Sequence, residues 1–135
     1  MQFLEDLILF AFNNGVKICF NPGRKELDQK DRLVKVIPKL DFFNLNRMEA
    51  SVLTGVSYED EKEIVKKIAD YGCRVTAITD GKKGASVVVN RTWIKMDAFP
   101  VDSVDDTGAG DAFVCGIVAG ILQHKKPEEY LKMGL

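Results

Sequence analysis

The chain has 135 residues, of which 46% are hydrophobic and 29% are charged, and its formal net charge is −1. This length and composition allow a buried core, which excludes the fibrous and disordered classes of protein. The 19 basic and 20 acidic residues form no long basic cluster, so nothing indicates binding to nucleic acid or to an anionic membrane, and small molecules or proteins are the expected partners.

The first third of the chain alternates between helical and extended patterns of apolar residues. Apolar residues recur at helical spacing over residues 3–11, and an Asn-Asn-Gly stop signal ends this predicted helix. Residues 16–20 predict a short buried strand that ends at an Asn-Pro-Gly turn. A second helix is predicted over residues 28–37, closed by Pro38, and a second short strand over residues 42–45.

Two further helices are predicted before the third strand. The first covers residues 46–53 and ends before Gly55. Its inward-facing residues are predicted to be Met48, Val52 and Leu53. The second begins with a capping box at Ser57 and ends at Gly72. Its residues at buried spacing are Ile64, Val65 and Ile68.

The remaining strand patterns complete an α/β fold. Residues 74–79 predict a strand, and a glycine-bounded loop follows over residues 80–84. Residues 85–89 and 92–96 flank an Asn-Arg pair, which predicts a β-hairpin. Alternating strands and helices with short connections indicate a mostly parallel sheet flanked by helices. We find no repeat or linker, so residues 1–135 are interpreted as a single α/β domain.

The cysteines and the apolar segments favour a cytoplasmic protein. Cys19, Cys73 and Cys115 lie beside apolar residues at no metal-ligand spacing, which predicts reduced thiols in the core. Residues 1–12 are apolar but contain two acidic residues and lack the basic leader of a signal peptide. The longest apolar run, residues 112–122, is shorter than the roughly 18 residues of a membrane span and predicts a core helix.

Three small residues stand at the start of this last helix. Gly108, Ala109 and Gly110 leave successive N–H groups uncovered by side chains, and the helix dipole adds about half a positive charge there. An anion suits this position, and Asp111 beside it is suited to accept the proton of an alcohol during phosphoryl transfer. Small residues could instead serve only close packing, and an aspartate in the first turn is common for dipole reasons alone.

The stretch DDTGAGDAF, residues 105–113, resembles the C-terminal signature of the PfkB, or ribokinase-like, carbohydrate kinases. Two other stretches agree with this family in order and spacing. Asn46 and Glu49 match its N-x-x-E motif. Its T-x-G-x-x-G loop is matched by Thr79, Gly81 and Gly84. Three matches in the right order are more specific than any one of them, and the resemblance covers nearly all of the chain.

The resemblance implies a role for each matched residue. Asp111 corresponds to the base that deprotonates the sugar hydroxyl, and the amides of residues 108–110 to the anion hole for the γ-phosphoryl group. Asn46 and Glu49 correspond to the pair that organises Mg²⁺, its waters and the ATP phosphates, in keeping with the hydration shell that Mg²⁺ retains. Asp105 corresponds to the position linked to a monovalent cation. The nucleotide site would be lined by Thr79, Gly81 and Gly84.

Some of these residues also have plainer interpretations. Asn46 could be a simple N-cap and Glu49 a solvated helix charge. Asp106 stands where the family usually has a small hydroxyl or apolar residue, which leaves the cation role of Asp105 open.

Family members are much longer than this chain, which resembles their C-terminal nucleotide-binding half. The sugar-binding residues and the lid over the site would precede Met1. We therefore expect an ATP-dependent phosphotransferase acting on a sugar hydroxyl, or the ATP-binding fragment of one, and expect the isolated chain to be inactive. An open sheet edge would be covered by the missing half or by another copy of the chain. The alternative is a non-catalytic nucleotide- or anion-binding α/β module that acts through oligomerisation.

Overall fold

The structure is a computed structural model that describes residues 1–100 and 108–135. Its α-helices are α1 (Gln2–Asn13), α2 (Arg24–Leu27), α3 (Lys30–Val36), α4 (Arg47–Thr54), α5 (Glu61–Asp70), α6 (Ala109–Leu122) and α7 (Pro127–Gly134). Two short 3₁₀ helices are η1 (Ile37–Lys39) and η2 (Gly81–Lys83). The strands are β1 (Cys19–Phe20), β2 (Phe42–Asn46), β3 (Val75–Thr79), β4 (Ala85–Val89) and β5 (Thr92–Met96).

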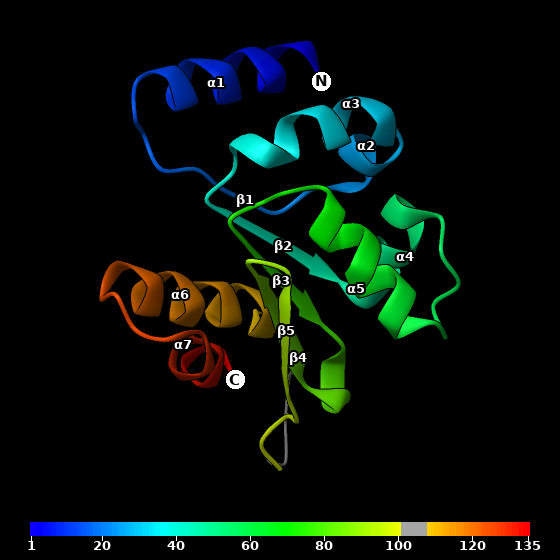
Figure 1. Cartoon of the computed structure of the whole chain (residues 1–135), viewed down its shortest axis with the longest axis vertical. Coiled ribbons are helices and arrows are strands. Elements are labelled where there is room, and N and C mark those ends of the chain that lie inside the picture. Colours follow the sequence, from blue (N-terminus) through cyan, green and yellow to red (C-terminus); the bar gives the residue numbers. More distant parts are fainter. Residues whose placement is uncertain (101–107) are drawn as a thin grey trace.

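The strands form one mixed sheet in the order β1-β2-β3-β4-β5 (Figure 1). The first three strands are parallel, and the hairpin of β4 and β5 continues the sheet by antiparallel pairing. Positive φ angles at Asn90 and Arg91 make the tight two-residue turn that the sequence predicts. The register pairs Asn46 with Thr79, the last residues of β2 and β3, so the carboxyl ends of these strands meet at one edge.

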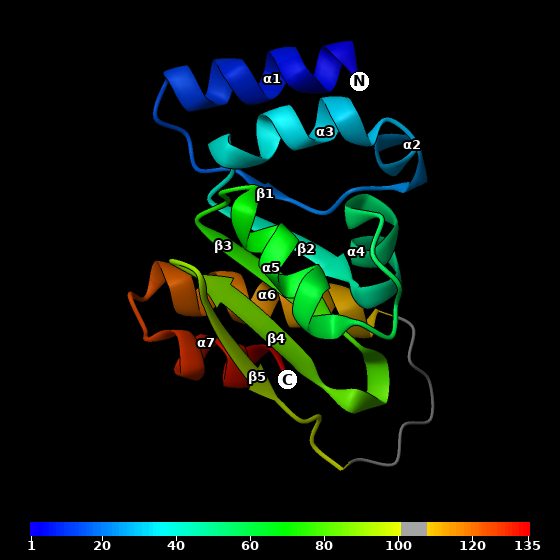
Figure 2. The ribbon, with the colours of Figure 1, turned by 45° about the vertical axis from the view of Figure 1, so that its right-hand side comes forward.

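Helices cover both faces of the sheet (Figures 1 and 2). Phe43 and Leu45 of β2 belong to a core shared with α3, α4 and α5, whereas Phe42 belongs to a second core shared with α6 and α7. This split follows from the strand geometry, because successive side chains of a strand point to opposite faces. The layered α/β architecture expected from the sequence is confirmed.

Helix α4 buries a different face from the one predicted. Met48 is 58% exposed and Val52 is 50% exposed, whereas Leu53 is buried as expected. The buried face is formed by Ala50, Leu53 and Thr54, at i, i+3 and i+4 spacing, and Met48 and Val52 lie outside it. The prediction for Met48 and Val52 was therefore wrong.

Helix α5 begins later than the predicted capping box. Its N-cap is Asp60, whose Oδ1 accepts a hydrogen bond from the Glu63 amide at 3.1 Å. Ser57 Oγ instead accepts from the amide of Glu59 at 3.4 Å, before the helix starts. Asp60 is the better cap because a carboxylate at this position also interacts favourably with the helix dipole.

The cysteines are free, but the prediction that they lie in the core is wrong. Cys19 and Cys115 are exposed and Cys73 is only partly buried. Cys19 belongs to β1, which has only two residues where five were expected and lies at the sheet edge. Cys115 lies on the exposed side of α6, whose buried residues are Phe113, Ile117 and Gly120.

Helices α6 and α7 approach each other at glycines. A Cβ atom on Gly116 would overlap the carbonyl oxygen of Met133, and one on Gly120 would overlap the Cβ of Tyr130. The two backbones therefore lie too close for any side chain to fit between them at these positions.

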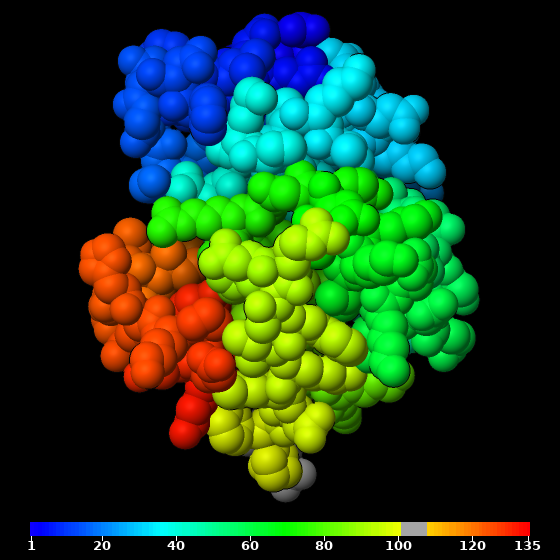
Figure 3. Space-filling model, viewed as in Figure 1, coloured from blue at the N-terminus to red at the C-terminus, as the bar shows by residue number. Residues whose placement is uncertain are grey.

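Helix α1 is the outermost layer of the chain and leaves much of its apolar surface uncovered. It packs against α3 and η1 and buries Ile8. Phe3 is 81% exposed and Phe10 is 65% exposed, and on the face shown in Figure 3 the helix rises above the rest of the chain. Within the described elements, none of the helices is long and apolar enough to cross a membrane.

Candidate nucleotide site

The N-x-x-E pair forms a reciprocal cap at the junction of β2 and α4. Asn46 Oδ1 accepts a hydrogen bond from the Glu49 amide at 2.8 Å, and the Asn46 amide donates to Glu49 Oε2, also at 2.8 Å. The cap satisfies two backbone N–H groups that would otherwise have no partner. It also fixes both side chains at the carboxyl end of β2, where ligands of α/β sheets bind. The N-cap interpretation of Asn46 is therefore correct. The cap uses Glu49 Oε2 and one lone pair of Asn46 Oδ1, so Glu49 Oε1 and the second lone pair of Asn46 Oδ1 stay outside it.

The glycine loop begins where β3 ends, next to this cap. The Asp80 amide donates to the Gly84 carbonyl at 2.9 Å and closes the loop. Gly84 has a φ of +94°, and a Cβ atom there would overlap the carbonyl oxygen of Met96. Only glycine fits at this position, because both the backbone conformation and the space exclude a side chain.

A shallow cavity of about 330 Å³ joins the two motifs. Asn46 from the first motif and Thr79 and Gly81 from the second line it. The other residues that line it are Arg47, Met48, Tyr58 and Asp80. The cavity thus brings together three of the five residues of the two motifs.

Two predicted site residues lie next to this cavity rather than on it. Glu49 lines a neighbouring hollow of about 340 Å³, which shares Met48 with the first. Gly84 lies at the far end of the glycine loop. The two hollows therefore flank the exposed side chain of Met48, on which the sequence analysis placed no function.

Residues 108–111 lie where the sequence predicts, at the start of α6. Gly108 is the N-cap of this helix, and Asp111 lies in its first turn with its side chain exposed. This end of α6 points to the same end of the sheet as the carboxyl end of β2 (Figure 2). Asp111 is not among the residues that line the cavity at Asn46. Asp105, the predicted cation position, lies outside the described residues.

Three charged or aromatic side chains at the cavity, those of Arg47, Tyr58 and Asp80, are not among the predicted site residues. Arg47 Nη1 lies 2.8 Å from Asp80 Oδ2, and the Tyr58 hydroxyl donates to Asp80 Oδ1 at 2.6 Å. The Arg47 guanidinium lies over the Tyr58 ring, 4.4 Å from its centroid. A signal was present, because Arg47 directly follows Asn46 and Asp80 stands between Thr79 and Gly81.

Electrostatics keep Asp80 ionised. Burial alone would raise the pKa of Asp80, but hydrogen bonds from Tyr58 and Arg47 and the charge of Arg47 hold this pKa below its ordinary value. The same hydrogen bond to Asp80 raises the pKa of Tyr58. The pair of Arg47 and Asp80 is therefore fully charged at neutral pH.

The oxygen ligands at the N-x-x-E cap fit a hydrated Mg²⁺ ion. In residues 1–100 and 108–135, no group of three or more His, Cys, Asp or Glu is arranged to hold a metal ion. Mg²⁺ rarely needs such a cage, because it keeps several waters and binds through one or two carboxylates and the substrate phosphates. The carboxylate of Glu49 and the amide oxygen of Asn46 supply this kind of site.

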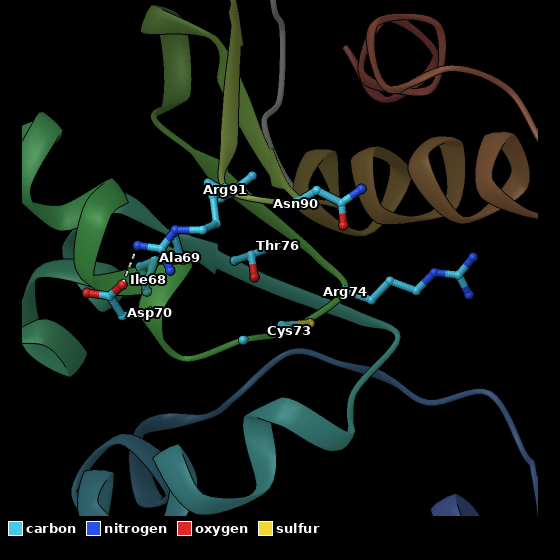
Figure 4. Close-up of a pocket in the computed structure, with 10 residues that line it drawn as sticks. Ile68, Ala69, Asp70, Cys73, Arg74, Thr76, Asn90 and Arg91 are labelled. Atoms are coloured by element: carbon cyan, nitrogen blue, oxygen red, sulfur yellow. Dashed lines mark hydrogen bonds and ion pairs between the residues drawn. The ribbon is translucent and has the colours of Figure 1, made fainter.

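A third hollow, of about 320 Å³, lies at the opposite end of β3 (Figure 4). It lies between the end of α5 and the turn of the hairpin, where Arg91 Nη2 lies 2.7 Å from Asp70 Oδ1. Burial raises the pKa of Cys73 in its wall to about 11, so this thiol stays protonated. None of the three motifs contributes to this hollow.

Comparisons with known proteins agree with this arrangement. The model of the family described as pfkB family carbohydrate kinase matches residues 2–135. The ribokinase of Haemophilus influenzae is 35% identical over 127 residues, and the cytidine kinase of Thermococcus kodakarensis is 32% identical over 125 residues. These matches cover 92% and 89% of this chain but only 40% and 44% of the two kinases.

A solved structure shows the same fold. The probable sugar kinase of Rhizobium etli superposes with a TM-score of 0.81 at 27% identity, over 96% of this chain and 40% of that protein. The chain thus spans less than half the length of these relatives. The family that three short motifs predict is confirmed, and the chain belongs to the pfkB family of carbohydrate kinases.

Proposed function

We propose that the chain is the C-terminal, nucleotide-binding half of an ATP-dependent kinase that phosphorylates a hydroxyl of a sugar or sugar-like alcohol. Membership of the family supports the reaction class. The observation that carries the nucleotide role is the pairing of Asn46 with Thr79 across β2 and β3, which brings two motifs to one cavity at the carboxyl edge of the sheet. The remainder of the active site, including the sugar pocket, belongs to the part of the relatives that this chain does not span.

Each motif has a task in this reaction. The substrate hydroxyl oxygen bonds to the γ-phosphorus of ATP, the bond from that phosphorus to the β–γ bridging oxygen breaks, and ADP leaves. Asp111 accepts the hydroxyl proton, and the N–H groups at the start of α6 stabilise the charge on the transferred phosphoryl group. Mg²⁺, held through waters by Asn46 and Glu49, would neutralise charge between the β- and γ-phosphates. The backbone of residues 79–84 approaches the nucleotide closely because two of its three motif positions, Gly81 and Gly84, carry no side chain.

Binding of MgATP to the isolated chain tests the nucleotide role. We expect the amide resonances of Gly81, Gly84, Gly108 and Gly110 to shift in NMR spectra on titration with MgATP. The amide of Gly72, which lines the hollow at the other end of β3, is the internal control and should not shift. Shifts that spread evenly over the chain, or none at millimolar MgATP, would contradict the proposal.

A further inference from the structure

The ion pair of Arg47 and Asp80 links the two motifs of the proposed nucleotide site. Arg47 is the first residue of α4 and directly follows Asn46. Asp80 lies between Thr79, the last residue of β3, and Gly81. The 2.8 Å contact between Arg47 Nη1 and Asp80 Oδ2 therefore joins segments that are 33 residues apart in the sequence.

This contact is more constrained than an ordinary surface ion pair. Arg47 is only 8% exposed, and its guanidinium carbon lies over the ring of Tyr58, 4.4 Å from the ring centroid. Tyr58 in turn donates its hydroxyl hydrogen to the second carboxylate oxygen of Asp80 at 2.6 Å. Both oxygens of Asp80 are thus held, and the three side chains fix one another in a single arrangement.

Stability alone does not account for this arrangement. A buried ion pair often stabilises a fold no more than apolar residues of the same volume, because both charges lose their hydration. Burial of Arg47 has a further cost in free energy, because its Nε loses hydration and has no hydrogen-bond partner among the described residues. The ion pair instead fixes the relative position of the two segments, because a planar guanidinium pairs with a carboxylate in few orientations.

We propose that Arg47 and Asp80 are positioning residues, which fix the distance between the Asn46 cap and the glycine loop so that both meet the same triphosphate. Tyr58 supports the pair by orienting Asp80. This inference rests on the proposed nucleotide role of the site. It assigns no contact with ATP to Arg47, whose Nη1 donates to Asp80 and whose Nη2 donates to the Glu59 carbonyl.

A double-mutant cycle on MgATP affinity tests the inference. The variants are Arg47→Ala, Asp80→Ala and the double variant, with dissociation constants measured by titration calorimetry at temperatures where circular dichroism shows each protein folded. We expect each single variant to weaken MgATP binding about tenfold, the scale seen for groups that orient a ligand's partners. The double variant should lose no more MgATP affinity than the weaker-binding single variant, because either change alone already breaks the contact between Arg47 and Asp80.

The ion pair of Arg91 and Asp70 provides a matched control. Its contact is 2.7 Å long, and it lies at the other end of β3, between α5 and the hairpin turn. Arg91→Ala should leave MgATP affinity unchanged. Tyr58→Phe covers the case in which the alanine variants do not fold, since it keeps the ion pair and removes only the hydroxyl that orients Asp80. It should weaken MgATP binding by about threefold, a fraction of the tenfold expected for the full link.

The outcomes separate the two proposals. Suppose that the wild-type protein binds MgATP and that the Arg47 and Asp80 variants bind it equally well, or that their losses of affinity add up in the double variant. Either result would overturn the positioning role and leave the nucleotide site intact. If only Tyr58→Phe folds, its unchanged affinity would overturn the positioning role. Wild-type protein that does not bind MgATP would overturn the nucleotide role, and the positioning role with it. A purely structural ion pair would lower the urea midpoint of the variants without changing the affinity of the folded protein.

Discussion

Replacing Glu49 by Gln separates the two roles that this side chain combines. Its carboxylate closes the cap of α4 through the Asn46 amide, and in the proposed function it also holds a hydrated Mg²⁺. Gln can close the same kind of cap, because its amide oxygen accepts the same hydrogen bond. Glu49→Gln therefore keeps the cap and removes only the negative charge.

The expected magnitudes follow from this geometry. The variant loses the interaction of a first-turn carboxylate with the helix dipole, about 0.3–1 kcal/mol of stability. If Glu49 orders the waters of Mg²⁺, the affinity for MgATP should fall about 10–100-fold, while the much weaker binding of ATP in EDTA stays the same. Urea unfolding measures the first quantity, and titration calorimetry with and without Mg²⁺ measures the second.

Helix α7 contains a matched control for this experiment. There the Lys126 amide donates to Glu129 Oε2 at 2.8 Å, the same distance and geometry as at Asn46. Glu129→Gln should cost the same small amount of stability and leave MgATP affinity unchanged. Equal MgATP affinity in the Glu49 and Glu129 variants would refute the metal role and leave Glu49 as a helix cap alone.

Three other predictions address the chemistry, the ion pair and the helix contact. In a protein that joins this chain to a sugar site, Asp111→Asn should lower kcat by about 10²–10⁴-fold in a phosphorylation assay and leave ATP binding nearly unchanged, and a wild-type kcat would remove its role as base. Asp80→Asn should cost about 3 kcal/mol at pH 7. The pKa of Asp80 is lowered in the folded state, so the ionised carboxylate stabilises the fold above about pH 4, and this stabilisation is lost as the pH falls through the lowered pKa. The free energies of urea unfolding of the wild type and of Asp80→Asn should therefore converge in acid. Gly120→Ala should cost about 1–3 kcal/mol by overpacking against Tyr130. Gly110→Ala, whose added Cβ meets no atom of residues 1–100 and 108–135 within 4 Å, should stabilise by about 0.5–1 kcal/mol, and equal urea midpoints would contradict the close helix contact.

The elements that the sequence predicts well are those whose signals are local. The hairpin was predicted to the residue because a β-rich run flanks each side of a two-residue turn at Asn90 and Arg91. The start of α6 was predicted because small residues precede a long apolar run. The edge on which Asn46 and Thr79 meet was also predictable, since parallel strands place their carboxyl ends together.

The sequence predicts poorly which face of a helix is buried and which side chains from distant segments meet. The buried face of α4 depends on what the helix packs against, because Met48 and Val52 are themselves four residues apart and so have the spacing of a buried stripe. This spacing placed both inside, but the structure buries Ala50 and Leu53 and leaves Met48 and Val52 exposed. The contact of Arg47 with Asp80 depends on the register of β2 against β3, which no local pattern specifies.

The glycine contact between α6 and α7 bears on the direction of Asp111, the proposed catalytic base. With Gly116 and Gly120 against the backbone of α7, α6 cannot rotate about its own axis without moving α7 as well. Asp111 lies on the same helix, nine residues before Gly120 and therefore roughly 14 Å away along its axis. The direction in which Asp111 points thus depends on Gly116 and Gly120, which lie in later turns of the helix. Selection for the right direction of Asp111 would act on these two glycines as much as on the site itself.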